Sequence, residues 1–413
     1  MSLYLIAGEP SGDRLGAALM AGLKELAGDV AFHGIGGPLM QAEGLQSLFA
    51  MDELSVMGIA EILPRYRQLK RRIAQTARDV LARAPDVLIT IDSPDFSFRV
   101  ARRVRQKSNI RTVHYVAPSV WAWRPGRASK IARYIDQVLA LLPFEPPYMQ
   151  AAGMRCDFVG HPVVAEPAVT PAQVQDFRKT HGLGDSPVVV VLPGSRRSEV
   201  ARLGPTFGAA LRLFLDAHPK FRVLVPAAAP VASAVLAMAQ NWPGQPLVLD
   251  PRQIPPAEAE TRKAHALAVA QVALAASGTV SLELSAAATP MVIAYELNWL
   301  SWQIISRLTK VDTVTLVNLV SESRAVPEFL GPACKAAPIA AALNGLIHDP
   351  AKRPAQLEAM APHHPARGRG APAPLGGDGG AAEAGRRALG LDRGAPDAGP
   401  AGLARHPGDV GQR

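Results

Sequence analysis

The sequence predicts an α/β protein built from two similar halves, each a parallel sheet with crossover helices. Its 413 residues exceed one ordinary α/β core and suit two domains of usual size. Short apolar runs alternate with amphipathic stretches of helix length up to about residue 350, the pattern of parallel strands joined by helices. A Pro-containing stretch at 163–171 separates two such series.

Each series contains short apolar runs that end in turn residues, and we expect a strand at each run. The first series predicts strands at 3–7, 31–35, 87–91, 112–116, 137–141 and 157–159. The second predicts strands at 188–192, 222–225, 247–249, 272–275 and 291–294. We therefore expect domains at 1–162 and 163–350.

The composition changes abruptly at about Ala361. Of the 53 residues from 361 to 413, 39 are Ala, Gly, Pro or Arg, and hydrophobic periodicity disappears. Such a segment buries too little apolar surface to offset its ordering entropy, so we expect a disordered tail. These four residues have the most GC-rich codons, so a shifted reading frame is one hypothesis for the tail, and a natural flexible tail is the other.

Composition excludes several classes of protein. Cys156 and Cys334 lie far apart with no further ligand at metal spacing, which argues against a disulfide framework and against zinc. No basic segment precedes the first apolar run, and no run of about 18 apolar residues occurs, so neither a signal peptide nor a spanning helix is expected. These features fit a protein of the reducing cytoplasm.

The net charge of +9 indicates an anionic partner: nucleic acid, phospholipid headgroups or phosphorylated substrates. Two basic blocks, at 65–72 and 99–107, both fall in the first half. Nothing resembles a nucleic-acid-binding module, so no nucleic acid is expected.

Two strand-to-helix turns of the first half are candidate ligand-binding or catalytic sites. The turn 8–13 exposes backbone N–H groups that hold anions or hydroxyl-rich ligands, although Ser11 or Asp13 could equally be the N-cap of a helix from about Leu15. Asp92 ends an apolar strand, where ligands of parallel sheets bind, and the following Ser-Pro keeps a loop open there. A turn or N-cap role for Asp92 is the alternative.

A third stretch, 114–123, leaves a strand and gathers aromatic and hydroxyl side chains. Its two tryptophans, Trp121 and Trp123, could stack on a sugar, pack an acyl chain or fill a core seam.

In the second half, residues 192–199 follow a strand and open a helix. Gly194 allows close backbone approach, the helix N-terminus favours negative charge, and Arg196 suits a diphosphate. This pattern lacks a full P-loop and predicts a phosphate site without a metal. The turn 276–279 would let a nucleotide approach closely, and Glu283 could accept hydrogen bonds from the ribose hydroxyls. A capped helix start is the alternative. No Ser–His–Asp order or H-E-x-x-H pattern supports a hydrolase.

These motifs together resemble a known family. The matching strings, in order, are AGEPSGD, VMGIAEILP, IDSPDF, HYVAPSVWAWR, LPFE, FVGHP, LPGSRRSEV, ASGTVSLE and VNLV. From Leu3 to about Pro350 the chain resembles the lipid-A-disaccharide synthases of Gram-negative bacteria, glycosyltransferase family 19. The resemblance implies a GT-B architecture, in which two Rossmann-like domains face each other across a cleft, the first binding the acceptor and the second UDP.

The resemblance also implies a reaction. A 2,3-diacylglucosamine passes from its UDP derivative to the 6-hydroxyl of 2,3-diacylglucosamine 1-phosphate (lipid X), with inversion, no metal and no cofactor. Asp92 is the expected base, and Arg196 with nearby N–H groups stabilises the departing UDP. Further UDP contacts are expected from Gly194, Ser195, Ser277, Gly278, Thr279, Glu283 and Asn318. Acceptor-side contacts are expected from Glu9, Ser11, Ser119 and Trp121.

The acylated substrates that the resemblance implies suggest a function for the basic stretch at 62–73. Apolar residues recur there at helical spacing between cations, typical of a helix lying on an anionic membrane, although a solvated helix packed on the sheet is the alternative. The expected membrane contacts are Ile62, Leu63, Tyr66, Leu69, Arg71 and Arg72, with Ile73 on the same face. This places the protein in the cytoplasm, peripheral on the inner face of the inner membrane. The sequence leaves open whether the protein forms a homodimer.

Two alternative functions and one difference from the family pattern remain. Another UDP-sugar enzyme of the same fold, such as a UDP-N-acetylglucosamine 2-epimerase, would share the nucleotide half, but IDSPDF and HYVAPSVWAWR argue against it. A non-catalytic basic membrane-binding protein would leave the ordered turn motifs without a purpose. The difference is the tail, because in two-Rossmann transferases the last helices cross back to complete the first domain.

Overall fold

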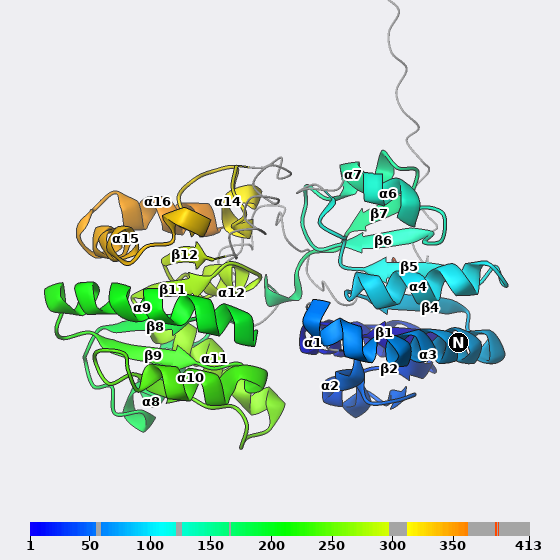
Figure 1. Ribbon diagram of the computed structural model, residues 1–413, viewed down its shortest axis with the longest axis horizontal. Helices are drawn as coiled ribbons and strands as arrows, with labels where there is room; N and C mark the ends of the chain where they lie inside the picture. The colour runs from blue at the N-terminus through cyan, green and yellow to red at the C-terminus, as the bar shows by residue number, and fades with distance from the viewer. Residues whose placement is uncertain are drawn as a thin grey trace, which may run out of the picture.

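The computed structural model describes residues 1–54, 59–120, 126–164, 167–296 and 312–361, together with Gly385 and Arg387. Within these ranges two parallel sheets lie side by side, each with helices on both faces (Figure 1). The predicted α/β class and the two-domain GT-B arrangement are confirmed. The division at residues 162 and 163 stays a prediction, and it falls between the two sheets.

The first sheet has seven strands in the order β3-β2-β1-β4-β5-β6-β7. Its strands are β1 Ser2–Ala7, β2 Ala31–Ile35, β3 Gln46–Ser47, β4 Val87–Ile91, β5 Arg111–Tyr115, β6 Gln137–Ala140 and β7 Arg155–Phe158. Its helices are α1 Pro10–Ala27, α2 Pro38–Ala42, η1 Met51–Glu53, α3 Ile59–Arg83, α4 Pro94–Arg105, α6 Gly126–Ile131 and α7 Pro146–Gln150. The short helix η2 Pro162–Val164 follows this sheet.

The second sheet has six strands in the order β10-β9-β8-β11-β12-β13. Its strands are β8 Val188–Leu192, β9 Arg222–Pro226, β10 Leu247–Leu249, β11 Val272–Ala276, β12 Met291–Tyr295 and β13 Glu328–Leu330. Its helices are α8 Pro171–Thr180, α9 Arg197–Ala217, η3 Ala229–Val231, α10 Ala232–Ala239, α11 Pro256–Val269, α12 Val280–Ala286, α14 Leu316–Val320, η4 Gly331–Ala333, α15 Ala336–His348 and α16 Lys352–Met360.

The central strands form where the sequence carries unbroken apolar runs. Every residue of β4 and of β8 is buried. Helices cover both faces of a parallel sheet, so its inner strands read as continuous rather than alternating hydrophobic runs. Among the edge strands, β7 and β10 agree with sequence predictions at 157–159 and 247–249, whereas β3 and β13 are short and carry no apolar run from which to predict them.

The start of α1 differs from the prediction. The helix begins at Pro10, not near Leu15, and neither Ser11 nor Asp13 caps it. The Asp13 carboxylate instead accepts hydrogen bonds from the backbone N–H groups of Gly37, Leu39 and Met40, at 2.8, 3.0 and 3.0 Å. Asp13 therefore ties the start of α2 to α1, which is a structural role.

In each sheet the chain adds strands first on one side of the starting strand and then on the other. In the first sheet β1 has β2 on one side and β4 on the other, and in the second sheet β8 has β9 and β11. Ligands of open parallel sheets bind beyond the carboxyl ends of strands where the strand order reverses in this way. The turns after β1, β4, β8 and β11 contain the four candidate motifs at 8–13, 92–96, 192–199 and 276–279.

At two positions the C-terminal segment differs from the expectation of a disordered tail. A Cβ placed on Gly385 would lie 3.1 Å from Leu23 and 3.2 Å from Leu26, both on α1. The Arg387 guanidinium lies 3.4 Å from the Asp157 carboxylate, and the Arg387 carbonyl accepts a hydrogen bond of 3.3 Å from Arg111. These residues pack on the first domain, which composition alone could not predict.

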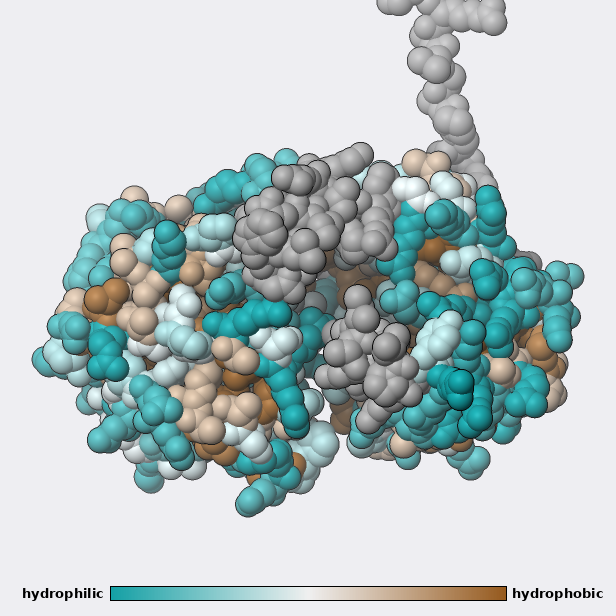
Figure 2. Space-filling model, in the orientation of Figure 1, coloured by the Kyte–Doolittle hydropathy of each residue, from teal (hydrophilic) through white to brown (hydrophobic). Residues whose placement is uncertain are grey.

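The surface of the first domain shows many hydrophilic residues over α3 and α4 (Figure 2). Exposed cations on these two neighbouring helices are Arg67, Lys70, Arg71, Arg99, Arg102 and Arg103. Among the described residues, no helix combines the length and the apolar character needed to cross a bilayer.

Candidate active site

Two turns of the first domain approach each other at the sheet reversal. Gly8 follows β1, and Asp92 and Ser93 follow β4. A Cβ on Gly8 would lie 2.5 Å from the Ser93 hydroxyl oxygen, so only glycine permits this approach. The close packing brings Glu9 near enough to Asp92 for their charges to interact.

The backbone is strained at this place. Asp92, Ser93 and Val116 have φ angles of +49°, +42° and +82°, a region that non-glycine residues rarely adopt. Such residues cost about 1–3 kcal/mol each and persist only where the surroundings hold them. The Asp92 N–H donates to the Tyr115 carbonyl at 3.0 Å, and the Ser97 hydroxyl donates to the Asp92 carbonyl at 2.9 Å. Three such residues lie together at this sheet edge, and Asp92 is the one among them with an ionisable side chain.

Two carboxylates of the first domain face a cation of the second. Burial raises the pKa of Asp92, while a backbone hydrogen bond at Ser93 and the charge of Arg196 oppose the shift. Burial also raises the pKa of Glu9, the charge of Asp92 adds to this rise, and Arg196 again opposes it. A carboxylate with a raised pKa is a stronger base than a surface aspartate.

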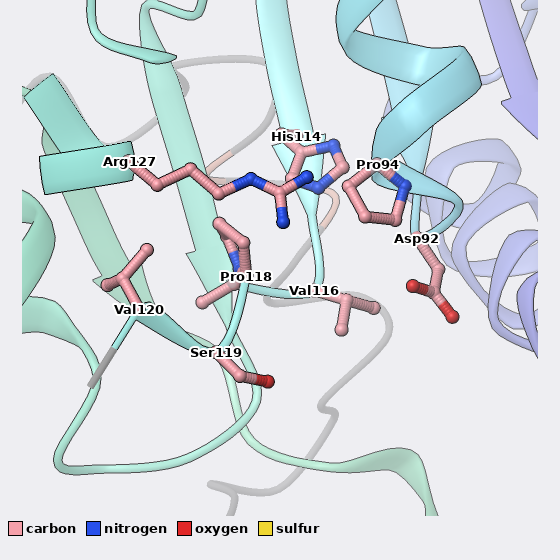
Figure 3. Close-up of a pocket in the computed structure, with 9 residues that line it drawn as sticks. Asp92, Pro94, His114, Val116, Pro118, Ser119, Val120 and Arg127 are labelled. Carbon is pink, nitrogen blue, oxygen red and sulfur yellow. The ribbon is translucent and has the colours of Figure 1, made fainter. Parts of the chain in front are cut away.

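A cavity of about 180 Å³ opens beside Asp92 (Figure 3). The described residues that line it are Asp92, Pro94, His114, Val116, Ala117, Pro118, Ser119, Val120 and Arg127. His114 is fully buried, with Nδ1 2.8 Å from the Thr90 hydroxyl, and burial together with Arg127 lowers its pKa to about 3. It is therefore neutral. Ser119, one of the residues expected to contact the acceptor, lines this cavity, Ser11 is exposed on α1, and Trp121 and Trp123 lie outside the described residues.

In the second domain the predicted anion site already holds a carboxylate of the chain. Glu199 Oε2 accepts the N–H groups of Ser195 and Arg196 at 3.1 and 3.3 Å, and Oε1 lies 3.1 Å from Arg196 Nη1. Gly194 has φ of +115°, and a Cβ there would lie 2.6 Å from Glu199 Oε2. The Tyr295 hydroxyl donates to Glu199 at 3.3 Å.

Sequence reasoning missed Glu199 as a member of the site. The available signal was its position three residues after Arg196, the spacing of a capping box. The carboxylate shows that this helix N-terminus does attract negative charge.

The turn after β11 lies next to the turn after β8, since the two strands pair. Gly278 and Thr279 are exposed and Ser277 is half-buried there. Glu283 of α12, predicted to accept ribose hydroxyls, forms an ion pair of 2.5 Å with Lys263 of α11. Burial alone would raise the pKa of Glu283, but the charge of Lys263 holds it below its usual value, with help from Arg14 and His161.

Asn318 does not join this group. Its side chain is buried, its Nδ2 donates to Val326 O at 2.9 Å and to Thr313 at 3.3 Å, and its Oδ1 accepts from Val326 N at 3.0 Å. These contacts fix the loop at 326, and the predicted UDP contact of Asn318 stays a prediction.

The predicted membrane helix is only partly as expected. Tyr66 is 43% exposed and Arg71 is exposed, whereas Ile73 is buried in the core and Leu69 is half-buried. Arg72 is paired with Glu53 at 2.5 Å and lies 4.3 Å over the Phe49 ring. Ile73 and Arg72 thus face the protein, which corrects their assignment to the membrane face. The side chains of Ile62 and Leu63 lie outside the described residues.

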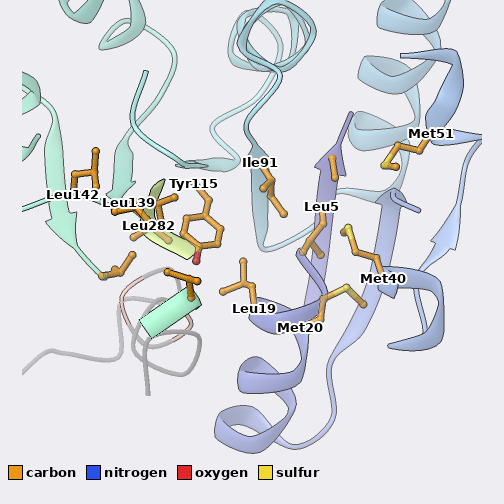
Figure 4. Packing of buried hydrophobic residues seen from close by; sticks show 14 of the residues in the cluster. Leu5, Leu19, Met20, Met40, Met51, Ile91, Tyr115, Leu139, Leu142 and Leu282 are labelled. Atoms are coloured by element: carbon orange, nitrogen blue, oxygen red, sulfur yellow. The ribbon is translucent and has the colours of Figure 1, made fainter. Parts of the chain in front are cut away.

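Apolar and charged contacts join the two domains beside the site. Leu282 of α12 belongs to the same hydrophobic cluster as Leu19, Tyr115 and Leu142 of the first domain (Figure 4). Arg14 of α1 forms an ion pair of 2.8 Å with Glu260 of α11. The described residues contain no group of three His, Cys, Asp or Glu side chains that could hold a metal ion.

Two Rossmann-like domains with ligand-type turns at facing sheet reversals define an enzyme of the GT-B class. The sequence model of the lipid-A-disaccharide synthetase family matches residues 3–363. The chain belongs to the lipid-A-disaccharide synthase family, and it is a glycosyltransferase.

Individual relatives agree with this assignment. The lipid-A-disaccharide synthase of Ruegeria pomeroyi is 63% identical over 357 residues, which cover 86% of this chain and 89% of that protein. The lipid-A-disaccharide synthase of Rhodospirillum centenum is 46% identical, with 87% and 88% covered. Among solved structures, the UDP-GlcNAc 2-epimerase from Neisseria meningitidis bound to UDP-GlcNAc is similar, with a TM-score of 0.66, 12% identity, and 95% of this chain and 100% of that chain covered. The latter likeness supports the fold alone.

Proposed function

We propose that the chain transfers 2,3-diacylglucosamine from its UDP derivative to the 6-hydroxyl of 2,3-diacylglucosamine 1-phosphate, giving the lipid A disaccharide 1-phosphate and UDP. The observation that carries this proposal is the position of Asp92. It combines a strained backbone, a raised pKa and an adjoining cavity, and it faces Arg196 of the other domain.

Each residue has a defined part in the transfer. Asp92 removes the proton of the acceptor 6-hydroxyl as that oxygen attacks the anomeric carbon of the donor. The bond from this carbon to the diphosphate oxygen breaks on the opposite face, and UDP leaves with the electron pair. Arg196 and the N–H groups of Ser195 and Arg196 stabilise the charge that develops on the diphosphate. Anion binding there displaces the Glu199 carboxylate from these donors.

Gly194, Ser277, Gly278, Thr279 and Glu283 form the remaining UDP side. The four turn residues follow β8 and β11, which pair with each other. Glu283 keeps its carboxylate ionised beside Lys263, and an ionised carboxylate is a good acceptor for ribose hydroxyls. Glu9 shares the charge environment of Asp92 and is assigned to the acceptor side with Ser11, Ser119 and Trp121.

The test measures UDP release and disaccharide formation by the purified full chain with both acylated substrates. Asp92→Asn should lower turnover by about 10²–10⁴-fold, because the amide keeps the shape and loses the basicity. Arg196→Ala should weaken UDP binding and slow transfer, while Arg197→Ala, one residue further and exposed, serves as the charge-matched control. Near-normal turnover of Asp92→Asn would exclude Asp92 as the base. Conversion of UDP-N-acetylglucosamine to its 2-epimer would favour the epimerase alternative.

The site of action follows from the substrates. Acylated sugars reside in a bilayer, and α3 and α4 carry exposed cations that attract anionic headgroups. We assign the protein to the cytoplasmic surface of the inner membrane.

A vesicle experiment tests this location. Replacing Arg67, Lys70 and Arg71 together by alanine should reduce co-sedimentation with anionic vesicles. Each cation that is removed should weaken the free energy of membrane binding by about 1 kcal/mol. The control removes three exposed cations of the second domain, Lys179, Arg212 and Lys220. Equal loss in both triple variants would indicate attraction by net charge without a specific face.

A further inference from the structure

The cavity beside Asp92 contains a cation that the transfer mechanism above does not use. Arg127 extends from α6 across the cavity toward His114 and Pro94 (Figure 3). Among the described lining residues it is the cation and Asp92 the anion, so the cavity has a positive and a negative side. The sequence prediction did not include Arg127.

The charge of Arg127 is only weakly compensated. Its Nη2 lies 3.8 Å from Asp95 Oδ1, and the Asp95 side chain is 93% exposed, so water screens this pair. Its guanidinium carbon lies 5.7 Å from the centre of the Phe98 ring, and the Arg127 side chain itself is 28% exposed. A half-buried guanidinium with a long, solvated partner is available to a stronger anion.

The other walls strengthen this preference. Val116, Pro118 and Val120 are apolar, and electrostatic attraction is stronger beside such surfaces than in water. His114 is neutral, so it neither competes with Arg127 for the anion's charge nor repels Arg127. The volume of about 180 Å³ lies below the roughly 300–1,000 Å³ of sites for drug-sized ligands, which suits a sugar headgroup and not its acyl chains.

We propose that Arg127 binds a phosphate monoester, the 1-phosphate of the acceptor sugar, while the acceptor hydroxyl lies at Asp92. This inference rests on the proposed function for the identity of the acceptor. The planar guanidinium suits a phosphate because it donates two parallel hydrogen bonds, which an ammonium group cannot do. One anchor at each side of the cavity fixes which hydroxyl meets the base, so Arg127 is a positioning and specificity residue.

The first experiment compares two acceptors, with and without the 1-phosphate, on the full chain. Arg127→Ala should raise KM for the phosphorylated acceptor about 10- to 100-fold, the range for a lost hydrogen bond to a charged group. The KM for the unphosphorylated acceptor and the KM for the UDP-sugar should stay within a few-fold. Arg127→Lys should recover part of the loss. Lys130→Ala removes an exposed cation of the same helix and should change nothing.

The second experiment measures equilibrium binding of glucosamine 1-phosphate and glucosamine, with no transfer involved. Arg127→Ala should bind the phosphorylated sugar at least tenfold more weakly and the neutral sugar equally well. Equal binding of glucosamine 1-phosphate by both proteins, or a similar loss for both sugars, would overturn the inference. If wild-type protein shows this discrimination but no transfer, the proposed function fails while the phosphate site stands.

Discussion

Asp92, the proposed base, carries a cost to the fold. It lies at positive φ, is largely removed from water, and keeps a carboxylate where burial disfavours the charge. Natural proteins retain such residues where activity needs them. Two measurable consequences follow, one for rate and one for stability.

The first prediction concerns the pH dependence of transfer. A base acts only when deprotonated, so kcat/KM should rise with pH through the pKa of Asp92. Because burial raises this pKa, the acidic limb should lie above the ordinary range of an aspartate. Asp92→Asn should abolish the limb. A limb that is unchanged in this variant would assign it to another group, with Glu9 the first candidate because its pKa is also raised.

The second prediction concerns stability. A carboxyl group whose pKa is raised by folding stabilises the protein below its unfolded pKa, and this contribution is lost as pH rises through the folded pKa. At neutral pH the ionised Asp92 therefore destabilises the fold, and Asp92→Asn should raise the melting temperature. The gain should vanish at pH values below the ordinary pKa of aspartate. Asp95→Asn, at an almost fully exposed position, should show no such pattern. A lower melting temperature for Asp92→Asn at neutral pH would contradict the argument.

At the scale of elements, α11 and α12 are joined by the Lys263–Glu283 ion pair. Both side chains are mostly buried, with 29% and 18% exposed. Removing one member of a buried pair costs about 3–5 kcal/mol, because the other charge stays without compensation. Arg14 still acts on Glu283, so the loss should lie at the lower end of this range.

The third prediction applies this to Lys263→Met, measured by chemical unfolding. The variant should lose stability at neutral pH and recover part of it as pH falls and Glu283 protonates. Adding Glu283→Gln should restore most of the loss at neutral pH. Arg262→Met removes a more exposed pair with Glu258 on the same helix and should cost only about 0.3–0.5 kcal/mol. A similar small loss for both variants would show that Lys263 is not needed to compensate Glu283.

At the scale of the whole molecule, the C-terminal segment is the main difference between composition and structure. Composition predicts that removal of everything after Ala361 costs little. The structure instead places Gly385 against Leu23 and Leu26, and Arg387 against Asp157. These contacts lie beyond residue 363, where the match to the family ends.

The fourth prediction separates these two expectations. A chain that ends at residue 361 should be less stable than the full chain by about 1 kcal/mol, since it uncovers part of two leucines and removes one ion pair. A chain that ends at residue 390 should unfold at the same temperature as the full chain. Identical melting temperatures for all three would mean that the contacts at 385 and 387 add nothing to stability.

The reading-frame hypothesis needs a separate test. The nucleotide sequence around codons 350–365 shows whether one inserted or deleted base restores a helical ending. A repaired chain should gain stability and activity if the family's last helices cover the first domain. No gain on repair would indicate that the tail is natural.

The sequence by itself determined the fold class, the family and most inner strands, because these depend on local patterns. Unbroken apolar runs such as 87–91 and 188–192 become central strands, and the turn residues after them mark the candidate sites. The edge strands β3 and β13, the true start of α1 and the inward orientation of Ile73 needed the structure, because the hydrophobic pattern of these segments does not decide between alternatives.

Only the tertiary structure decided which polar side chains meet. Strand order brings the turns at 8–13 and 92–96 together, and domain packing brings Arg196 to Asp92 and Glu9. The pairing of Glu283 with Lys263 and the place of Arg127 in the cavity also follow from tertiary packing. Arg14 and Glu260 lie 246 residues apart in sequence and 2.8 Å apart in space. A local pattern sets each residue's chemistry, but its charge environment comes from neighbours that are remote along the chain.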